Sequence, residues 1–143
     1  MTAMPMTKKA IDQLLAQPHI AVVAVTAPDG APHAVPTWYE YKGGKVTFHT
    51  DRTAFKYKCL EYDPRIALVV DTKKAPYKCV ILKGRASIEI KKNDDARGLR
   101  MSIAYLGKKN GLAYFNTMKG HEVAVVTLKP EHIISWDYSK EMP

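Results

Sequence analysis

Four residues between positions 50 and 56 have side chains of the kind that bind a phosphate group. Thr50 and Thr53 carry hydroxyls, and Arg52 and Lys56 carry positive charges. A strand predicted over 45–49 runs into this polar turn, and a short helix then begins. The start of a helix has free N–H groups and partial positive charge, so a lysine there is unfavourable unless an anion lies beside it. The pattern indicates either a phosphate cradle or a capped surface helix with solvated charges.

A second candidate is Pro36, which falls inside a strand predicted over 33–41. Proline lacks the N–H that a central strand needs, so this strand must lie at an edge, bulge or break near 36–38. Backbone groups beside the proline would then be free to bond something other than a strand, such as a flat heteroaromatic ring. An ordinary edge strand explains the proline equally well.

Hydrophobic patterning and capping signals predict the elements that position these residues. The predicted order is a helix over 8–17 capped by Thr7, an antiparallel meander of strands 19–26, 33–41 and 45–50, a helix that stops before Asp63, strands 65–71 and 78–90, helices from the N-cap Asn93 to Gly107 and over about 110–118, a strand over 121–128 and an extended piece over 131–138.

Two of these elements carry further expectations. In the helix before Asp63, the spacing of Phe55, Cys59 and Tyr62 predicts a buried stripe. The long strand 78–90 alternates clearly, as expected of a strand that coils around a barrel, and Gly84 is a natural bend in it. Because strands dominate and connections are short, the chain is expected to be mainly β, as a small antiparallel barrel with helices packed at its side and mouth.

Length and charge limit the class of protein. The chain has 143 residues, which suggests one domain over 1–143, and its net charge of +8 favours anionic partners such as phosphorylated cofactors or nucleic acid. Alternation puts Trp38 on the opposite face from Tyr39 and Tyr41, so an aromatic groove for nucleic acid is weakly supported and no such partner is expected. No apolar run could span a membrane and no secretory signal is present, so we expect no membrane partner and a cytoplasmic protein.

The cysteines and histidines give little support to a metal site. Cys59 and Cys79 lie far apart and fit neither a CxxC motif nor a zinc pattern. The five histidines are scattered and form no HxxxH or HxH pair. We therefore expect two buried structural thiols and no metal.

The ordered set of segments 24–38, 46–50, 63–68 and 80–88, together with Lys56, resembles the pyridoxamine 5′-phosphate oxidase-like family of flavin- and deazaflavin-binding proteins. The resemblance covers about residues 11–138. It implies a six-stranded antiparallel split β-barrel with Greek-key connections. It also implies a homodimer that binds its cofactor at the interface between the two chains.

The resemblance also assigns roles to residues. A lysine at the position of Lys56 contacts the cofactor phosphate, and the region of His49 and Thr50 contacts phosphate or ring. Pro36, Thr37 and Trp38 lie along the tricyclic ring. Arg52, Thr53 and Tyr77 complete the candidate cofactor-binding set, although Tyr77, like Trp136 and Tyr138, is better explained as a packing aromatic. Phe55 stands where many relatives have a second basic residue.

The implied function is that of an oxidoreductase that transfers hydride to or from a small organic acceptor. The cofactor is either FMN or the deazaflavin coenzyme F420, and the sequence favours neither. No catalytic residue can be assigned, because no acid–base pair stands out. The alternative is a protein that binds a flavin, a deazaflavin or haem without turning over a substrate.

Overall fold

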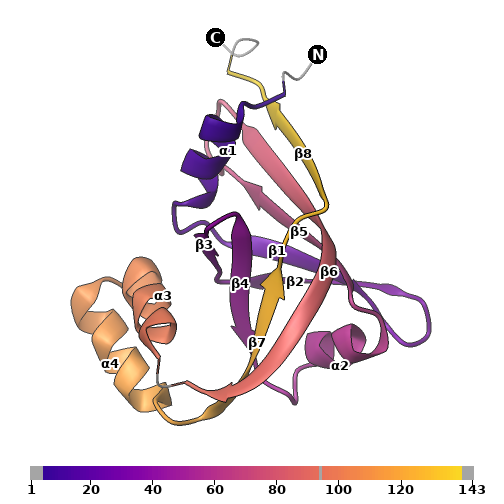
Figure 1. Ribbon diagram of the computed structural model, residues 1–143. Helices are drawn as coiled ribbons and strands as arrows, with labels where there is room; N and C mark the ends of the chain where they lie inside the picture. Colours follow the sequence, from indigo (N-terminus) through magenta and orange to yellow (C-terminus); the bar gives the residue numbers. More distant parts are fainter. Residues whose placement is uncertain (1–4, 94, 140–143) are drawn as a thin grey trace.

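The computed structural model describes residues 5–93 and 95–139 (Figure 1). Four helices flank eight strands, so the expected mainly β fold with flanking helices is confirmed. The elements in chain order are α1 (Lys8–Leu15), β1 (Ala21–Thr26), β2 (Pro32–Thr37), β3 (Glu40–Lys42), β4 (Lys45–Thr50), α2 (Phe55–Tyr62), β5 (Arg65–Asp71), β6 (Lys78–Lys92), α3 (Ala96–Leu106), α4 (Lys108–Met118), β7 (Glu122–Leu128) and β8 (His132–Asp137).

Strand β6 belongs to both halves of the barrel and joins them. Its first part pairs with β5 and β8, and its second part, from Ala86 on, pairs with β7 (Figure 1). Gly84 lies at this change of partner, where an added Cβ would stand 2.8 Å from the Cδ1 atom of Leu128. The absence of a side chain therefore lets the end of β7 pass close to the bend, as the sequence suggested.

The expected second strand is broken in two. Residues 38 and 39 are not in a strand, so β2 ends at Thr37 and β3 begins at Glu40. The hydrogen-bonded order is β2-β1-β5-β6-β7-β4-β3, which puts β2 and β3 at opposite ends. The two hairpins β1–β2 and β3–β4 are present, but the expected three-stranded meander is wrong, because β2 does not pair with β4. The chain instead crosses between the two edges of the barrel at Trp38 and Tyr39, two residues after the proline that predicted a break.

The strand count exceeds six for two reasons. The break described above divides one expected strand into β2 and β3. In addition, the expected extended piece at the end of the chain pairs with β6 as β8. The core lies inside the barrel and includes Phe48, Leu68 and Leu82, all fully buried.

The buried face of α2 differs from the expected one. Phe55 and Tyr62 are 49% and 59% exposed, whereas Tyr57, Cys59 and Leu60 are buried. The predicted stripe was therefore wrong except at Cys59. Phe55 instead lies edge-on against the ring of His33 on β2, with ring centroids 4.8 Å apart. This contact places the beginning of α2 beside the edge strand β2.

Helices α3 and α4 form a hairpin beside β4 and β7 (Figure 1). At its base, the Asn93 N–H donates to the His121 carbonyl (2.8 Å). The side chain that caps α3 is that of Asp95, which accepts from the Gly98 N–H (3.1 Å), so the expected N-cap at Asn93 was wrong by two residues.

The hairpin is fixed to the barrel by charge and by close packing. Arg100 of α3 donates two hydrogen bonds to the carboxylate of Glu40 on β3, at 2.7 and 2.9 Å. Between the helices, an added Cβ at Gly111 would stand 2.5 Å from the Cα of Ile103. Within the described residues, no helix is long and apolar enough to cross a membrane.

Candidate functional site

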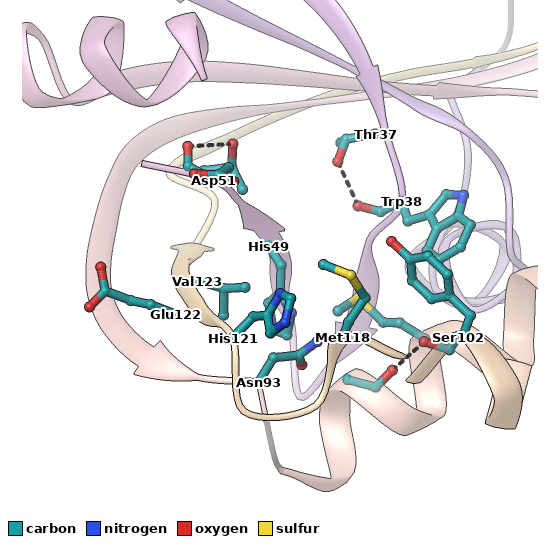
Figure 2. Close-up of a pocket in the computed structure, with 14 residues that line it drawn as sticks. Thr37, Trp38, His49, Asp51, Asn93, Ser102, Met118, His121, Glu122 and Val123 are labelled. Carbon is teal, nitrogen blue, oxygen red and sulfur yellow. Dashed lines mark hydrogen bonds between the residues drawn. The ribbon is translucent and has the colours of Figure 1, made fainter. Parts of the chain in front are cut away.

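A cavity of about 290 Å³ lies between the α3–α4 hairpin and the ends of β2, β4 and β7 (Figure 2). Four of the nine predicted cofactor-binding residues line it, namely Thr37, Trp38, His49 and Thr50. The remaining lining residues are Asp51, Asn93, Gly98, Met101, Ser102, Tyr114, Met118, His121, Glu122 and Val123. The cavity therefore forms where the strand break at Trp38 faces the helical hairpin.

One wall of this cavity is aromatic and apolar. The Trp38 ring stacks on Tyr105 of α3, with centroids 4.9 Å apart and planes inclined by 4°. Tyr114 of α4 meets Trp38 at 5.7 Å and 66°. Met101 and Met118 line the same cavity from the two helices. Because methionine adapts to flat surfaces, this wall suits a planar ring.

The opposite part of the cavity holds polar atoms that have no partner. Among the described residues, Nε2 of His49 and Oδ1 of Asn93 are buried without a hydrogen bond. Burial lowers the pKa of His49 below its ordinary value, so the imidazole is neutral near pH 7. His121 lines the same space (Figure 2). A bound molecule that hydrogen-bonds to His49 would remove the penalty of leaving its Nε2 unpaired.

The turn after β4 uses its own donors internally. The Thr53 N–H and hydroxyl both donate to Oδ1 of Asp51, each at 3.0 Å. Arg52 donates to Glu122 of β7 at 3.0 Å. Neither Thr53 nor Arg52 lines the cavity. Both are thus already engaged with a carboxylate of the protein itself.

Lys56, in contrast, has no such partner. It lies in the first turn of α2, is half-buried, and holds its Nζ 6.0 Å from the ring centroid of Phe48. Among residues 5–93 and 95–139, no carboxylate oxygen lies within 4 Å of this nitrogen, and no side chain caps α2 at Ala54. Burial lowers the pKa of Lys56. A half-buried cation at an uncapped helix start fits an anion such as a phosphate.

Two other predicted residues lie outside the cavity. Pro36 is exposed on β2, opposite Val22 of β1. Tyr77 is 45% exposed just before β6, where its carbonyl accepts from the Tyr138 N–H (3.0 Å). The structure thus brings together Thr37, Trp38, His49 and Thr50 but leaves Pro36, Arg52, Thr53, Lys56 and Tyr77 outside the cavity.

The cavity residues from the hairpin were missed by sequence reasoning. Met101, Tyr114 and Met118 read as ordinary helix residues, and Asn93 was expected only as a cap. The expectation that helices pack at the mouth of the barrel was the one signal that pointed to them. For the described residues, no three His, Cys, Asp or Glu side chains group as a metal site would require.

Several solved structures share this fold. A conserved hypothetical protein from Mycobacterium tuberculosis matches with a TM-score of 0.77 and 20% identity, over 100% of this chain and 92% of that one. An F420 reductase matches with a TM-score of 0.68 and 19% identity, over 86% and 94%. The haem storage protein HutZ from Vibrio cholerae matches with a TM-score of 0.66 and 14% identity, over 91% and 94%. At these identities the similarity establishes the fold alone.

Sequence comparison gives the family. No curated protein matches the chain. The family model described as pyridoxamine 5′-phosphate oxidase, however, matches residues 7–137, which include all the strands, all the helices and every residue of the cavity. This chain, with its split barrel and its cavity beneath the helical hairpin, is therefore a member of the pyridoxamine 5′-phosphate oxidase family.

Proposed function

We propose that this protein is an oxidoreductase that uses FMN or coenzyme F420 to transfer hydride to or from a small organic acceptor. The observation that carries the proposal is Lys56, a half-buried cation without a carboxylate at the uncapped start of α2. Both cofactors contain a phosphate group that would satisfy this cation. Family membership and an F420 reductase of the same fold support the same assignment.

The remaining residues have separate tasks in this proposal. Thr37 and Thr50, at the ends of β2 and β4, would hold the flat ring together with the exposed edge at Pro36, and Trp38 would form the boundary between that ring and the acceptor cavity. A bound cofactor of this kind supplies the hydride chemistry itself. The chain's own contribution is to orient the ring, and to use the cavity beneath the hairpin to hold the acceptor away from water.

A fluorescence titration of the purified protein with FMN, riboflavin and F420 tests the proposal. We expect micromolar or tighter binding of FMN or F420. If FMN binds, riboflavin, which has the same ring without the phosphate, should bind at least tenfold more weakly. If neither phosphorylated cofactor binds, the proposal is wrong. Identifying the bound cofactor would also decide between FMN and F420 and direct the search for the acceptor.

A second candidate function is haem binding without turnover. It is favoured by the unpartnered Nε2 of His49 and by His121 in the same cavity, since a neutral imidazole is a common iron ligand. A haem is larger than this cavity of about 290 Å³ and would have to extend out of its mouth. HutZ, a haem storage protein, has the same fold. Titration with haem separates the two functions, because a Soret band that disappears in a His49→Ala variant supports haem binding, whereas an unchanged band in that variant removes His49 as a ligand.

We also propose a homodimer, formed through the outer face of the sheet that contains β2, β1, β5, β6 and β8. The strand register aligns five apolar side chains in one row across this face: Pro36, Val22, Val69, Ile81 and Ile134. Val22 is 37% exposed and Ile134 is 43% exposed. A row of this kind on a sheet face is typical of a protein interface.

Sedimentation of Val22→Asp tests this interface. A second copy of the chain is the occupant we propose, and a carboxylate in the middle of the row would lose its hydration in the dimer. The variant should sediment as a monomer at concentrations where the native protein is a dimer. The matched control is Ile90→Asp, which alters an equally exposed residue at the far end of β6 and should leave the dimer intact. A native monomer would refute the proposal.

A further inference from the structure

The charges around the cavity contrast with those of the rest of the chain. The protein has 22 lysines and arginines against 14 acidic residues. Yet none of the described residues that line the cavity is a lysine or an arginine, and two of them, Asp51 and Glu122, are carboxylates (Figure 2). A phosphate or carboxylate inside this space would therefore lose water without gaining a counter-ion from these residues.

The two carboxylates are themselves already neutralised or bonded. Glu122 pairs with Arg52 at 3.0 Å, and Asp51 accepts two hydrogen bonds from Thr53. They therefore have little remaining demand for a cation. The described residues that line the cavity thus offer no free charge to compensate a ligand ion of either sign.

The size and shape of the cavity narrow the class of ligand further. A volume of about 290 Å³ lies at the lower end of the range for small-molecule pockets, which suits one or two fused rings. Trp38 is held in place by its stack on Tyr105, so the aromatic wall is preformed. Met101 and Met118 can adjust to the outline of a flat ring.

The unpartnered polar atoms near the cavity indicate which hydrogen-bonding groups a ligand should carry. Nε2 of His49 is buried in the cavity without a partner among the described residues. Oδ1 of Asn93 is also unpartnered among them, but it lies over the first turn of α3, 2.2 Å from where a Cβ on Gly98 would stand, so it is covered by the helix. A ligand with a carbonyl or an N–H on its ring edge would satisfy His49, according to the tautomer of the imidazole.

We propose that the acceptor cavity takes an uncharged planar ring system that carries a hydrogen-bonding group on its edge, such as a lactam, and that it excludes phosphorylated and carboxylated molecules. The word "acceptor" rests on the oxidoreductase function proposed above. The binding preference does not, because it follows from the residues that line the cavity. It separates this chain from an oxidase whose substrate carries a phosphate, although both belong to one family.

A matched pair of ligands tests the preference. The probes are 2-quinolone, an uncharged bicyclic lactam, and its 4-carboxylate, which adds one negative charge to the same ring. Binding is followed by NMR through the Trp38 indole N–H in a Trp136→Phe background, which leaves one tryptophan. We expect the lactam to bind at least tenfold more tightly than the carboxylate. Equal binding, a preference for the carboxylate, or no binding of either probe would overturn the inference.

Three variants show whether the probes bind in this cavity. Met118→Lys places a cation in the cavity and should reverse the preference, whereas Thr117→Lys adds the same charge at the next residue, on the exposed side of α4, and should not. A preference that is unchanged by Met118→Lys would show that the probes bind elsewhere. His49→Ala should weaken lactam binding. If His49→Ala does not fold, the reversal of the preference in Met118→Lys alone decides whether the probes bind in this cavity.

The outcome is separable from that of the proposed function. The same preparation is titrated with FMN and F420, and the quinolone experiment is repeated with the cofactor that binds. A protein that binds neither cofactor but prefers the lactam refutes the oxidoreductase proposal and leaves the cavity preference standing. A protein that binds a cofactor but prefers the carboxylate refutes only the cavity preference.

Discussion

The ring of Trp38, at the break between β2 and β3, lies parallel to the ring of Tyr105 on α3, with centroids 4.9 Å apart. The same tyrosine also fixes the backbone of the break. Its hydroxyl donates to the His19 carbonyl (2.7 Å) and accepts from the Tyr39 N–H (3.1 Å). One side chain of the hairpin therefore holds both the aromatic wall of the cavity and the chain crossing that creates it.

Tyr105→Phe should keep the stack but lose the hydrogen bonds. The His19 carbonyl and the Tyr39 N–H would then lack a partner in a partly buried place, which should destabilise the protein by about 1–3 kcal/mol. Urea unfolding measures this loss. Near-UV circular dichroism should show the Trp38 signal largely retained in Tyr105→Phe and lost in Tyr105→Ala. Native stability in both variants would mean that the hairpin is held elsewhere.

Lys56→Ala should weaken cofactor binding and leave the fold intact. A charge-assisted contact to a phosphate contributes about 1.5–3 kcal/mol, so affinity for the phosphorylated cofactor should fall about tenfold or more. Lys58→Ala is the matched control, because Lys58 lies in the same helix and is exposed. The titration with FMN or F420 gives the answer, and equal affinities for Lys56→Ala and the native protein would remove Lys56 from the site.

Local patterns predicted most of the elements but not their partners. The break near Pro36 could be foreseen because proline cannot complete a ladder. The placement of β2 and β3 at opposite ends of the strand order could not, since that depends on which strands pair across the whole chain. On α2, the i, i+4, i+7 spacing selected Phe55 and Tyr62, but the helix packs through Tyr57, Cys59 and Leu60.

The candidate site was predictable only where it follows the strands. Thr37, Trp38, His49 and Thr50 lie at the ends of β2 and β4, and the resemblance to the family pointed to all four. The second half of the cavity comes from a hairpin some 50 residues further on, whose docking rests on long-range contacts such as that of Arg100 with Glu40. No local pattern contains that information.

Gly111→Ala should loosen the hairpin. In an ordinary helix this change would stabilise by up to about 1 kcal/mol. Here the new Cβ would stand 2.5 Å from the Cα of Ile103, a backbone atom that cannot turn aside, and overpacking of this kind costs about 1–3 kcal/mol. We therefore expect a net loss of stability by urea unfolding. Asn110→Ala, at an exposed neighbouring position, should be neutral or slightly stabilising, and a stabilised Gly111→Ala protein would show that the two helices are not in close contact.

The last prediction concerns pH and the buried imidazole of His49. Burial lowers its pKa from the ordinary 6.5; Asp95 and Glu40 oppose this shift and Arg97 and Lys91 assist it. Above pH 6.5 the imidazole is neutral in the folded and the unfolded protein, so it adds no pH dependence. Below pH 6.5 the unfolded chain binds a proton that the folded protein does not yet bind. The free energy of unfolding should therefore decrease as the pH is lowered below 6.5, until the pH passes the pKa of His49 in the folded protein.

His49→Gln should remove this loss, because glutamine is similar in reach and does not titrate. The quantity to measure is the free energy of unfolding in urea at several values between pH 7.5 and 5. The difference between native and variant proteins should be constant above pH 6.5 and should shift in favour of the variant below it. His132→Gln, at an exposed histidine that opens β8, is the control for the exchange of a histidine for a glutamine as such. If the His49→Gln curve is parallel to that of the native protein, then the His49 imidazole is protonated as readily in the folded protein as in the unfolded chain, and the neutral His49 on which the cavity argument depends is wrong.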